Sequence, residues 1–122
     1  VMMKLINNLI CGVQIATIAE AIALIERAGM DRDKVLNILY AGAPGSPIVK
    51  AIGPRMAAKD YGVNFVLKLM EKDLRYALAV AGQHGAELET VAAAHKLFQT
   101  AAQKGFAEKD MSAVVEPLRA RR

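Results

Sequence analysis

Cysteine and strand-like patterning are both scarce in this sequence. It has a single cysteine, Cys11, so no internal disulfide can form, and we expect a reducing, cytoplasmic environment. No segment alternates apolar and polar residues over the length of a strand, and no segment recurs as a repeat. The sequence therefore argues against a disulfide-stapled domain, a β-sheet protein and a repeat protein.

The common catalytic and phosphate-binding motifs are missing as well. There is no G-x-G-x-x-G, no P-loop and no nucleophile elbow. His84 and His95 lack Cys, Asp or Glu partners at ligand spacing, so we expect no metal site. The net charge is +4, but three of the sixteen basic residues stand in the final "RARR", and no stripe of Lys and Arg alternates with aromatic residues elsewhere. We therefore expect no nucleic-acid partner.

Apolar residues, by contrast, are abundant. They make up 54% of the 122 residues, which favours one compact, alanine-rich helical domain. So much apolar surface predicts a face that is covered by a neighbouring domain or a second subunit. The first residue is Val1 rather than Met, and we expect the chain to be cut from something longer.

The first 28 residues have the composition of one long helix. Residues 2–28 contain no proline and one glycine, and Gly29 is a typical helix stop. Such a helix would be about 40 Å long, so it must run through the centre of the domain or reach into a partner. Polar residues interrupt the apolar run from Leu5 to Ile25, which favours a buried helix over a membrane span. The interrupting residues are Asn7, Asn8, Gln14, Thr17 and Glu20.

Start and stop signals divide the remainder into shorter helices. Asp31 or Asp33 can cap a helix that ends at Gly42, and Ser46 followed by Pro47 opens another through Met56. The further signals are a bend near Gly53 and Pro54, a cap at Asn64 for a helix that stops between Gly82 and Gly85, a helix over residues 88–103 stopped by Gly105, and a short last helix capped by Asp110 and ended near Pro117. The prediction is an all-α fold, a bundle of five to six helices around the long first one.

Polar residues near the start of the long helix form the first candidate site. Lys4, Asn7, Asn8 and Cys11 are spaced at i, i+3, i+4 and i+7, so they share one helix face. An ammonium beside a carboxamide, framed by apolar side chains, suits an anionic or carbonyl-bearing ligand. A lysine desolvated there can act as an acid or base. The alternative is that Lys4 reaches solvent and the asparagines bond to backbone.

The stretch "FVLKLMEKDLRYA" is the second candidate site. On a helix, Phe65 and Lys72 would lie seven residues apart on one face, with Leu69 between them and Tyr76 one turn further on. A cation next to an aromatic ring suits contact with a flat ring or a phosphate. The alternative is that the "EKD" triplet is ordinary solvated surface.

These two motifs together resemble those of a known enzyme family. Lys4 and Asn8 as K-x-x-x-N, and F-x-x-x-L-x-x-K-D-L from Phe65 to Leu74, are similar to the C-terminal domain of the β-hydroxyacid dehydrogenases. This is the family of 3-hydroxyisobutyrate dehydrogenase and tartronate semialdehyde reductase. The resemblance covers essentially the whole chain, including "AGAPGSP" and "KGFAEKDMSAVVEPLR". It implies a fold like the C-terminal domain of 6-phosphogluconate dehydrogenase.

The resemblance also implies roles for particular residues. Lys4 corresponds to the catalytic lysine that exchanges a proton with the substrate oxygen, and Asn8 to the asparagine that positions the substrate. Phe65 corresponds to an aromatic residue lining the substrate pocket, and Lys72 to a lysine near the nicotinamide end of the cofactor. Asn7 and Asp73 match the pattern without a clear role. The cofactor is NAD or NADP, bound mainly by an N-terminal dinucleotide-binding domain that residues 1–122 do not contain.

By the same resemblance, residues 1–122 are a helical substrate and dimerisation domain of a cytoplasmic oxidoreductase. Its partners would be a small hydroxyacid, its own N-terminal Rossmann domain and further copies in a homodimer or homotetramer, with no membrane. We expect the chain alone to be inactive. The main alternative is a non-catalytic helical dimerisation module of the same fold, and retention of Lys4 counts against it. An imine-reducing relative ranks lower because such proteins usually lack this lysine.

Overall fold

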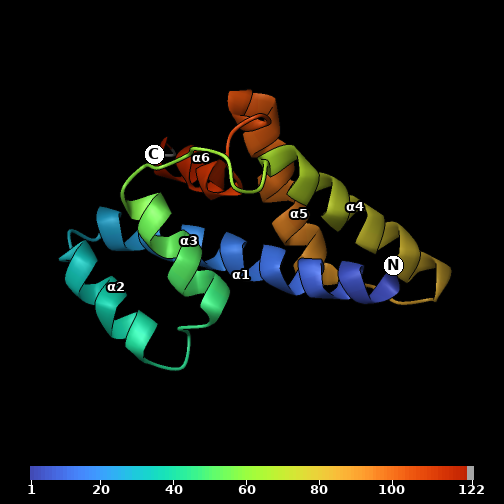
Figure 1. Cartoon of the computed structure of the whole chain (residues 1–122), viewed down its shortest axis with the longest axis horizontal. Coiled ribbons are helices and arrows are strands. Elements are labelled where there is room, and N and C mark those ends of the chain that lie inside the picture. Colours follow the sequence, from blue (N-terminus) through green and yellow to red (C-terminus); the bar gives the residue numbers. More distant parts are fainter. Residues whose placement is uncertain (121–122) are drawn as a thin grey trace.

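The computed structural model describes residues 1–120, which form a bundle of helices around one long helix (Figure 1). No strand occurs among these residues, and the only strand-like pairing is an isolated bridge between Val66 and Asp110. The elements in order are α1 Met2–Arg27, α2 Arg32–Ala41, α3 Pro47–Ala57, α4 Leu67–Gln83, α5 Glu89–Ala101, a π turn Ala102–Phe106, a 3₁₀ turn Met111–Val114 and α6 Val115–Ala120. The all-α prediction is confirmed.

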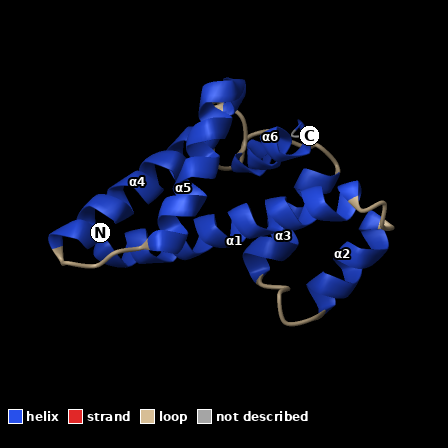
Figure 2. Ribbon diagram, turned by 180° about the vertical axis from the view of Figure 1, so that it is seen from behind, coloured by secondary structure: helices blue, strands red, loops and turns tan. Residues whose placement is uncertain are grey.

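Helix α1 is the axis of the bundle. The hairpin of α4 and α5 packs against its N-terminal half, and α2 and α3 lie beside its C-terminal half (Figures 1 and 2). Its core face carries Ile15, Ala19 and Ile22, which are fully buried at a spacing of three or four residues. The helix ends where predicted, with Gly29 in the left-handed conformation at φ 71°.

The opposite face of α1 is uncovered. By length and apolar composition alone the helix could cross a membrane, but 44% of its most apolar 18-residue stretch is buried inside the bundle. Met3, Ile6, Ile10 and Leu24 nevertheless remain exposed, at 43 to 76% of their surface. This is the apolar surface that the composition predicts a neighbour to cover.

The predicted caps of α2 and α3 are confirmed. Of the two candidates for α2, Asp31 is the cap, because its carboxylate accepts from the backbone N–H of Lys34 at 3.3 Å. Ser46 caps α3 by accepting from the N–H of Val49 at 3.3 Å. Helix α3 then runs on through Pro54 to Ala57 as a single helix.

The predicted cap of α4 is wrong. Helix α4 begins at Leu67 rather than after Asn64, and Val66 precedes it without a side-chain cap. The carboxylate of Asp110 accepts from the backbone N–H groups of Asn64 and Phe65, so a distant residue holds this segment in place before the helix begins. Phe65 therefore lies before the helix, and its helical spacing from Lys72 does not hold.

The chain's C-terminal end also departs from the prediction. Pro117 does not end the last helix, because it is the third residue of α6. Proline is tolerated there, since the first N–H groups of a helix have no partner within it. Gly105 does mark the end of the α5 region, at φ 101°, and Asp110 caps the following 3₁₀ turn as predicted by accepting from the N–H of Ser112 at 2.9 Å.

Candidate functional site

The candidate site is centred on a contact between α1 and α4. The carboxamide nitrogen of Asn8 donates to a carboxylate oxygen of Asp73 at 2.8 Å, and Asn7 donates to the carboxamide oxygen of Asn8 at 3.2 Å. Because a carboxylate can only accept hydrogen bonds, Asp73 determines which end of the Asn8 carboxamide faces it. The Asn8 side chain is therefore held in one orientation between two helices.

Gly12, one turn beyond Asn8, lets these helices approach each other. A Cβ atom at Gly12 would lie 2.9 Å from Cδ2 of Leu74 and 3.0 Å from the sulfur of Met70. An alanine here would require the buried side chains of Leu74 and Met70 to shift, and a much larger residue would push α1 and α4 apart. The glycine thus brings Asn8 within hydrogen-bonding distance of Asp73.

Lys4 lies one helical turn before Asn8 on the same face of α1. Its side chain is exposed, and it makes no hydrogen bond or ion pair with any residue of the described range 1–120. The sequence predicts a lysine in a pocket that excludes water. Residues 1–120 do not supply the walls of such a pocket, so in this chain the amine of Lys4 is free and open to a ligand or another domain.

Lys72 immediately precedes Asp73 on α4 and is exposed. Its ammonium lies 5.4 Å from the centroid of the Tyr76 ring, and the guanidinium of Arg75 lies 5.6 Å from the same centroid. The aromatic partner of Lys72 is thus Tyr76, one turn further along, and not Phe65. Arg75 is also paired with Glu71 at 3.1 Å, so Lys72 is the cation on this ring that has no ion-pair partner within residues 1–120.

Phe65 stands apart from these residues. It is half-buried and packs against the hydrophobic core before α4 begins. From Leu67 to Asp73 the helix rises about 9 Å, at 1.5 Å per residue. The structure therefore pairs Asn8 with Asp73, with Lys4 one turn before Asn8 and Lys72 one residue before Asp73. Phe65 lies just before the start of α4, about two helical turns from Asp73 along the chain.

Sequence reasoning missed the function of two aspartates. Asp73 matches the pattern but had no role, and the signal that it pairs with Asn8 is available only when α1 and α4 are packed together. The sequence predicts Asp110 as a cap for the turn that follows it, but its contacts with residues 64 and 65 depend on the tertiary fold.

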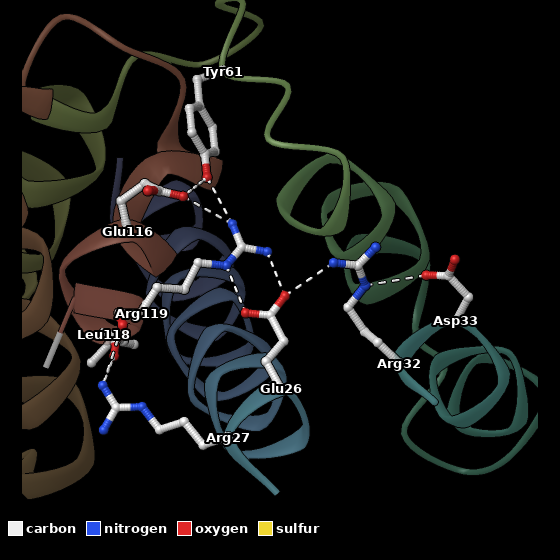
Figure 3. Close-up of polar contacts among 8 residues, drawn as sticks. All are labelled: Glu26, Arg27, Arg32, Asp33, Tyr61, Glu116, Leu118 and Arg119. Carbon is white, nitrogen blue, oxygen red and sulfur yellow. Dashed lines mark hydrogen bonds and ion pairs between the residues drawn. The ribbon is translucent and has the colours of Figure 1, made fainter. Parts of the chain in front are cut away.

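A second polar cluster joins α1, α2, α6 and the segment before α4 (Figure 3). The guanidinium of Arg119 donates to both carboxylate oxygens of Glu26, at 2.8 and 2.9 Å, and to Glu116 at 2.9 Å. Hydrogen bonds from Arg119 hold the pKa of Glu26 below its ordinary value. Tyr61 and Arg32 complete the cluster. Its donors and acceptors satisfy one another, so it ties the fold together rather than offering a free reactive group.

The residues present fit the nicotinamide end of a dinucleotide better than its phosphates. Lys72 and the Tyr76 ring are exposed on α4, the helix whose Asp73 holds the Asn8 carboxamide, and an exposed ring with a cation suits contact with a flat polar ring. The glycine-rich turn that binds the pyrophosphate of a dinucleotide joins a strand to a helix, and residues 1–120 have no strand. His95 pairs with Glu71 at 2.6 Å, and no group of three or more His, Cys, Asp or Glu side chains in the described chain is placed to hold a metal ion.

This helical bundle, with its polar face at the head of the long helix, has the architecture of a hydroxyacid dehydrogenase domain. It matches the crystal structure of 3-hydroxyisobutyrate dehydrogenase from Salmonella typhimurium with a TM-score of 0.91, at 29% identity over 94% of this chain. Residues 1–118 match the family described as NAD-binding of NADP-dependent 3-hydroxyisobutyrate dehydrogenase, and the chain belongs to that family.

Curated relatives carry both enzymatic and other names. The chain is 36% identical over 117 residues to glyoxylate/succinic semialdehyde reductase 1 of Arabidopsis thaliana, and 34% identical over 112 residues to the cytokine-like nuclear factor N-PAC of Anopheles gambiae. These matches include 96% and 92% of this chain. The chain spans 40% of the length of the reductase and 20% of that of the nuclear factor.

Proposed function

We propose that this chain is the helical, C-terminal substrate and dimerisation domain of a cytoplasmic NAD(P)-dependent β-hydroxyacid dehydrogenase. The observation that carries the proposal is the Asn8–Asp73 hydrogen bond, because it orients a carboxamide one helical turn from the free amine of Lys4. Family membership supports oxidoreductase chemistry on a small hydroxyacid of the 3-hydroxyisobutyrate or tartronate semialdehyde type.

Lys4 is proposed as the general acid and base. Oxidation of an alcohol to a carbonyl removes a proton from its oxygen, and reduction returns one. An amine next to that oxygen can exchange the proton and can stabilise the charge that develops there. NAD or NADP, when bound, accepts or supplies the hydride.

Asn8 is proposed to position the substrate. Its carboxamide nitrogen has two N–H groups, of which one is used by Asp73, and its oxygen already accepts from Asn7. The second N–H is therefore the donor left for a substrate oxygen. By family resemblance, Phe65 is assigned to the part of the substrate-pocket wall nearest the start of α4, away from the Asn8–Asp73 pair, and Lys72 to the nicotinamide end of the cofactor.

The proposal assigns the remaining walls of the site to a dinucleotide-binding domain N-terminal to this chain. Lys4 is exposed here, and a lysine must be shielded from water to transfer a proton efficiently at a reacting centre. The chain by itself is therefore expected to have no dehydrogenase activity.

The test is turnover of small β-hydroxyacids by the full-length protein that carries this chain. We expect Lys4→Ala to lower kcat by about 10²- to 10⁴-fold, the usual contribution of a general acid or base. Lys50→Ala, which removes an exposed lysine of α3, is the matched control and is expected to leave the rate unchanged. An unchanged rate in Lys4→Ala would show that this residue has no part in catalysis.

A second candidate function is a non-catalytic dimerisation module of the same fold. The relative named as a nuclear factor and the uncovered apolar face of α1 favour it. The two proposals differ in one measurement, because the module would show no hydroxyacid turnover in the full-length protein while keeping its oligomeric state.

A further inference from the structure

The side chain of Asp110 is fully buried and accepts hydrogen bonds at both of its carboxylate oxygens. One oxygen accepts from the backbone N–H of Asn64 at 2.9 Å and of Phe65 at 3.0 Å. The other accepts from the N–H of Ser112 at 2.9 Å. A buried carboxylate is costly unless its oxygens are satisfied in this way.

A charged partner completes the environment of this carboxylate. A guanidinium nitrogen of Arg55, from α3, lies 2.9 Å from the oxygen that faces Ser112. Burial acts to raise the pKa of Asp110, but the backbone donors, led by Phe65, hold it below its ordinary value. Asp110 is therefore a permanent anion at neutral pH and joins α3, the segment before α4 and the 3₁₀ turn.

The backbone on either side of Asp110 lies beside the segment that carries Phe65 and is hydrogen-bonded to it. The N–H of Met111 donates to the carbonyl of Phe65 at 2.8 Å, and the N–H of Leu67 donates to the carbonyl of Lys109 at 2.8 Å. The N–H of Asp110 donates to the carbonyl of Tyr61 at 3.0 Å, and the Tyr61 hydroxyl belongs to the Arg119 cluster (Figure 3). The path of residues 61–67 is thus set by the C-terminal part of the chain.

We propose that Asp110 is a positioning residue for substrate binding: its buried carboxylate fixes the backbone of residues 64 and 65, and so places the Phe65 ring at the start of α4. The proposal rests on the proposed function, in which Phe65 lines the substrate pocket. A local cap at Asn64 would place Phe65 in the first turn of a helix, on the same face as Leu69. The distant carboxylate instead holds Phe65 in an extended segment before the helix.

The test uses the full-length protein with Asp110→Asn, and Asp60→Asn as the matched control. Both aspartates contact Arg55, but Asp60 is exposed and bonds no residue of the Phe65 segment beyond Gly62. Hydrogen exchange measured by mass spectrometry reports directly on the amides of residues 64 and 65. We expect Asp110→Asn to speed their exchange about tenfold or more, because their acceptor is weakened, while exchange in α5 and throughout the control is unchanged.

Steady-state kinetics then show whether the hydrogen bonds from Asp110 to residues 64 and 65 affect substrate binding. In Asp110→Asn we expect the KM for the hydroxyacid to rise about tenfold, with the KM for NAD(P) and kcat changed much less. Combining Asp110→Asn with Phe65→Leu should raise the KM little beyond Phe65→Leu alone, because both act through the same ring. If Asp110 only stabilises the fold, its replacement should lower the melting temperature without raising the KM for the hydroxyacid selectively.

Each outcome separates the two proposals. Unchanged exchange at residues 64 and 65, or faster exchange with an unchanged KM, overturns the role of Asp110. Absence of hydroxyacid turnover in the unsubstituted protein overturns the proposed function and the substrate role with it, while the exchange data still decide whether Asp110 holds the backbone of residues 64 and 65. If Asp110→Asn does not fold, Asp110→Glu is the second variant, because it keeps the anion opposite Arg55 but displaces the carboxylate by one methylene from the amides of residues 64 and 65. Faster exchange at these amides and a higher KM are expected, and no change in either contradicts the proposal.

Discussion

At the scale of single residues, the candidate site depends on how one carboxamide is used. Asn8 has two N–H groups and one oxygen; Asp73 takes one N–H and Asn7 supplies a donor to the oxygen. That leaves one N–H, with its direction set by the α1–α4 contact. A substrate oxygen that meets this donor would also lie near the turn that carries Lys4, which is why Asp73 matters although it need not touch the substrate.

Replacing Asp73 therefore tests the orientation of Asn8. In the full-length protein, Asp73→Ala should weaken transition-state binding by about 1–2 kcal/mol, which is about 5- to 30-fold in kcat/KM. Asp73→Asn keeps an oxygen that can accept from Asn8 and should lose less. Steady-state kinetics measure both variants, and equal activity in all three proteins would contradict the orienting role.

At the scale of elements, the approach of α1 to α4 depends on a missing side chain. Gly12 is buried in the middle of α1, where a glycine costs helix stability relative to alanine. Glycine nevertheless suits this position, because the side chains of Leu74 and Met70 fill the space where a Cβ atom would lie. The local preference of the helix is thus overridden by the contact between helices.

Two glycine-to-alanine substitutions separate these effects. Gly12→Ala should lower the free energy of unfolding by about 1–2 kcal/mol, because overpacking outweighs the gain in helix propensity. Gly82→Ala, inside α4 with no atom within 4 Å of the added Cβ, should instead stabilise the protein by about 0.5–1 kcal/mol. Denaturant unfolding measures both, and a stabilising Gly12→Ala would mean that the Leu74 and Met70 side chains move aside at little cost.

At the scale of the whole molecule, ion pairs of Arg119 join α6 to the rest of the bundle. Arg119 links the C-terminal end of α1 to the segment before α4, so the first and the last helix meet in one cluster (Figure 3). The hydrogen bonds of Arg119 lower the pKa of Glu26. Burial acts to raise the pKa of Glu116, but hydrogen bonds from Tyr61 and then from Arg119 hold it below its ordinary value. Both carboxylates are therefore more acidic in the folded protein than in the unfolded chain.

A lowered carboxylate pKa makes stability depend on acid in a definite direction. The contribution is complete above the unfolded pKa, near 4.5 for these glutamates, and is lost as pH falls through the lower folded values. Arg119→Met should cost about 3 kcal/mol at neutral pH and should flatten the decline of stability below about pH 4.5. Unfolding free energies measured between about pH 3 and pH 7 test this, and an unchanged slope would rule out Arg119 as the source.

Sequence alone predicts the helical class, the long axis helix and the caps at Ser46 and Asp110, and it narrows the cap of α2 to Asp31 or Asp33, because these follow from composition and from signals within a few residues. It also put Lys4 and Asn8 on one face, since both belong to one helix. The start of α4, the position of Phe65 and the partner of Asn8 were decided only by the tertiary structure. Each depends on a carboxylate from a distant part of the chain, and no local pattern records which backbone or side-chain donors such a carboxylate will meet once the helices pack.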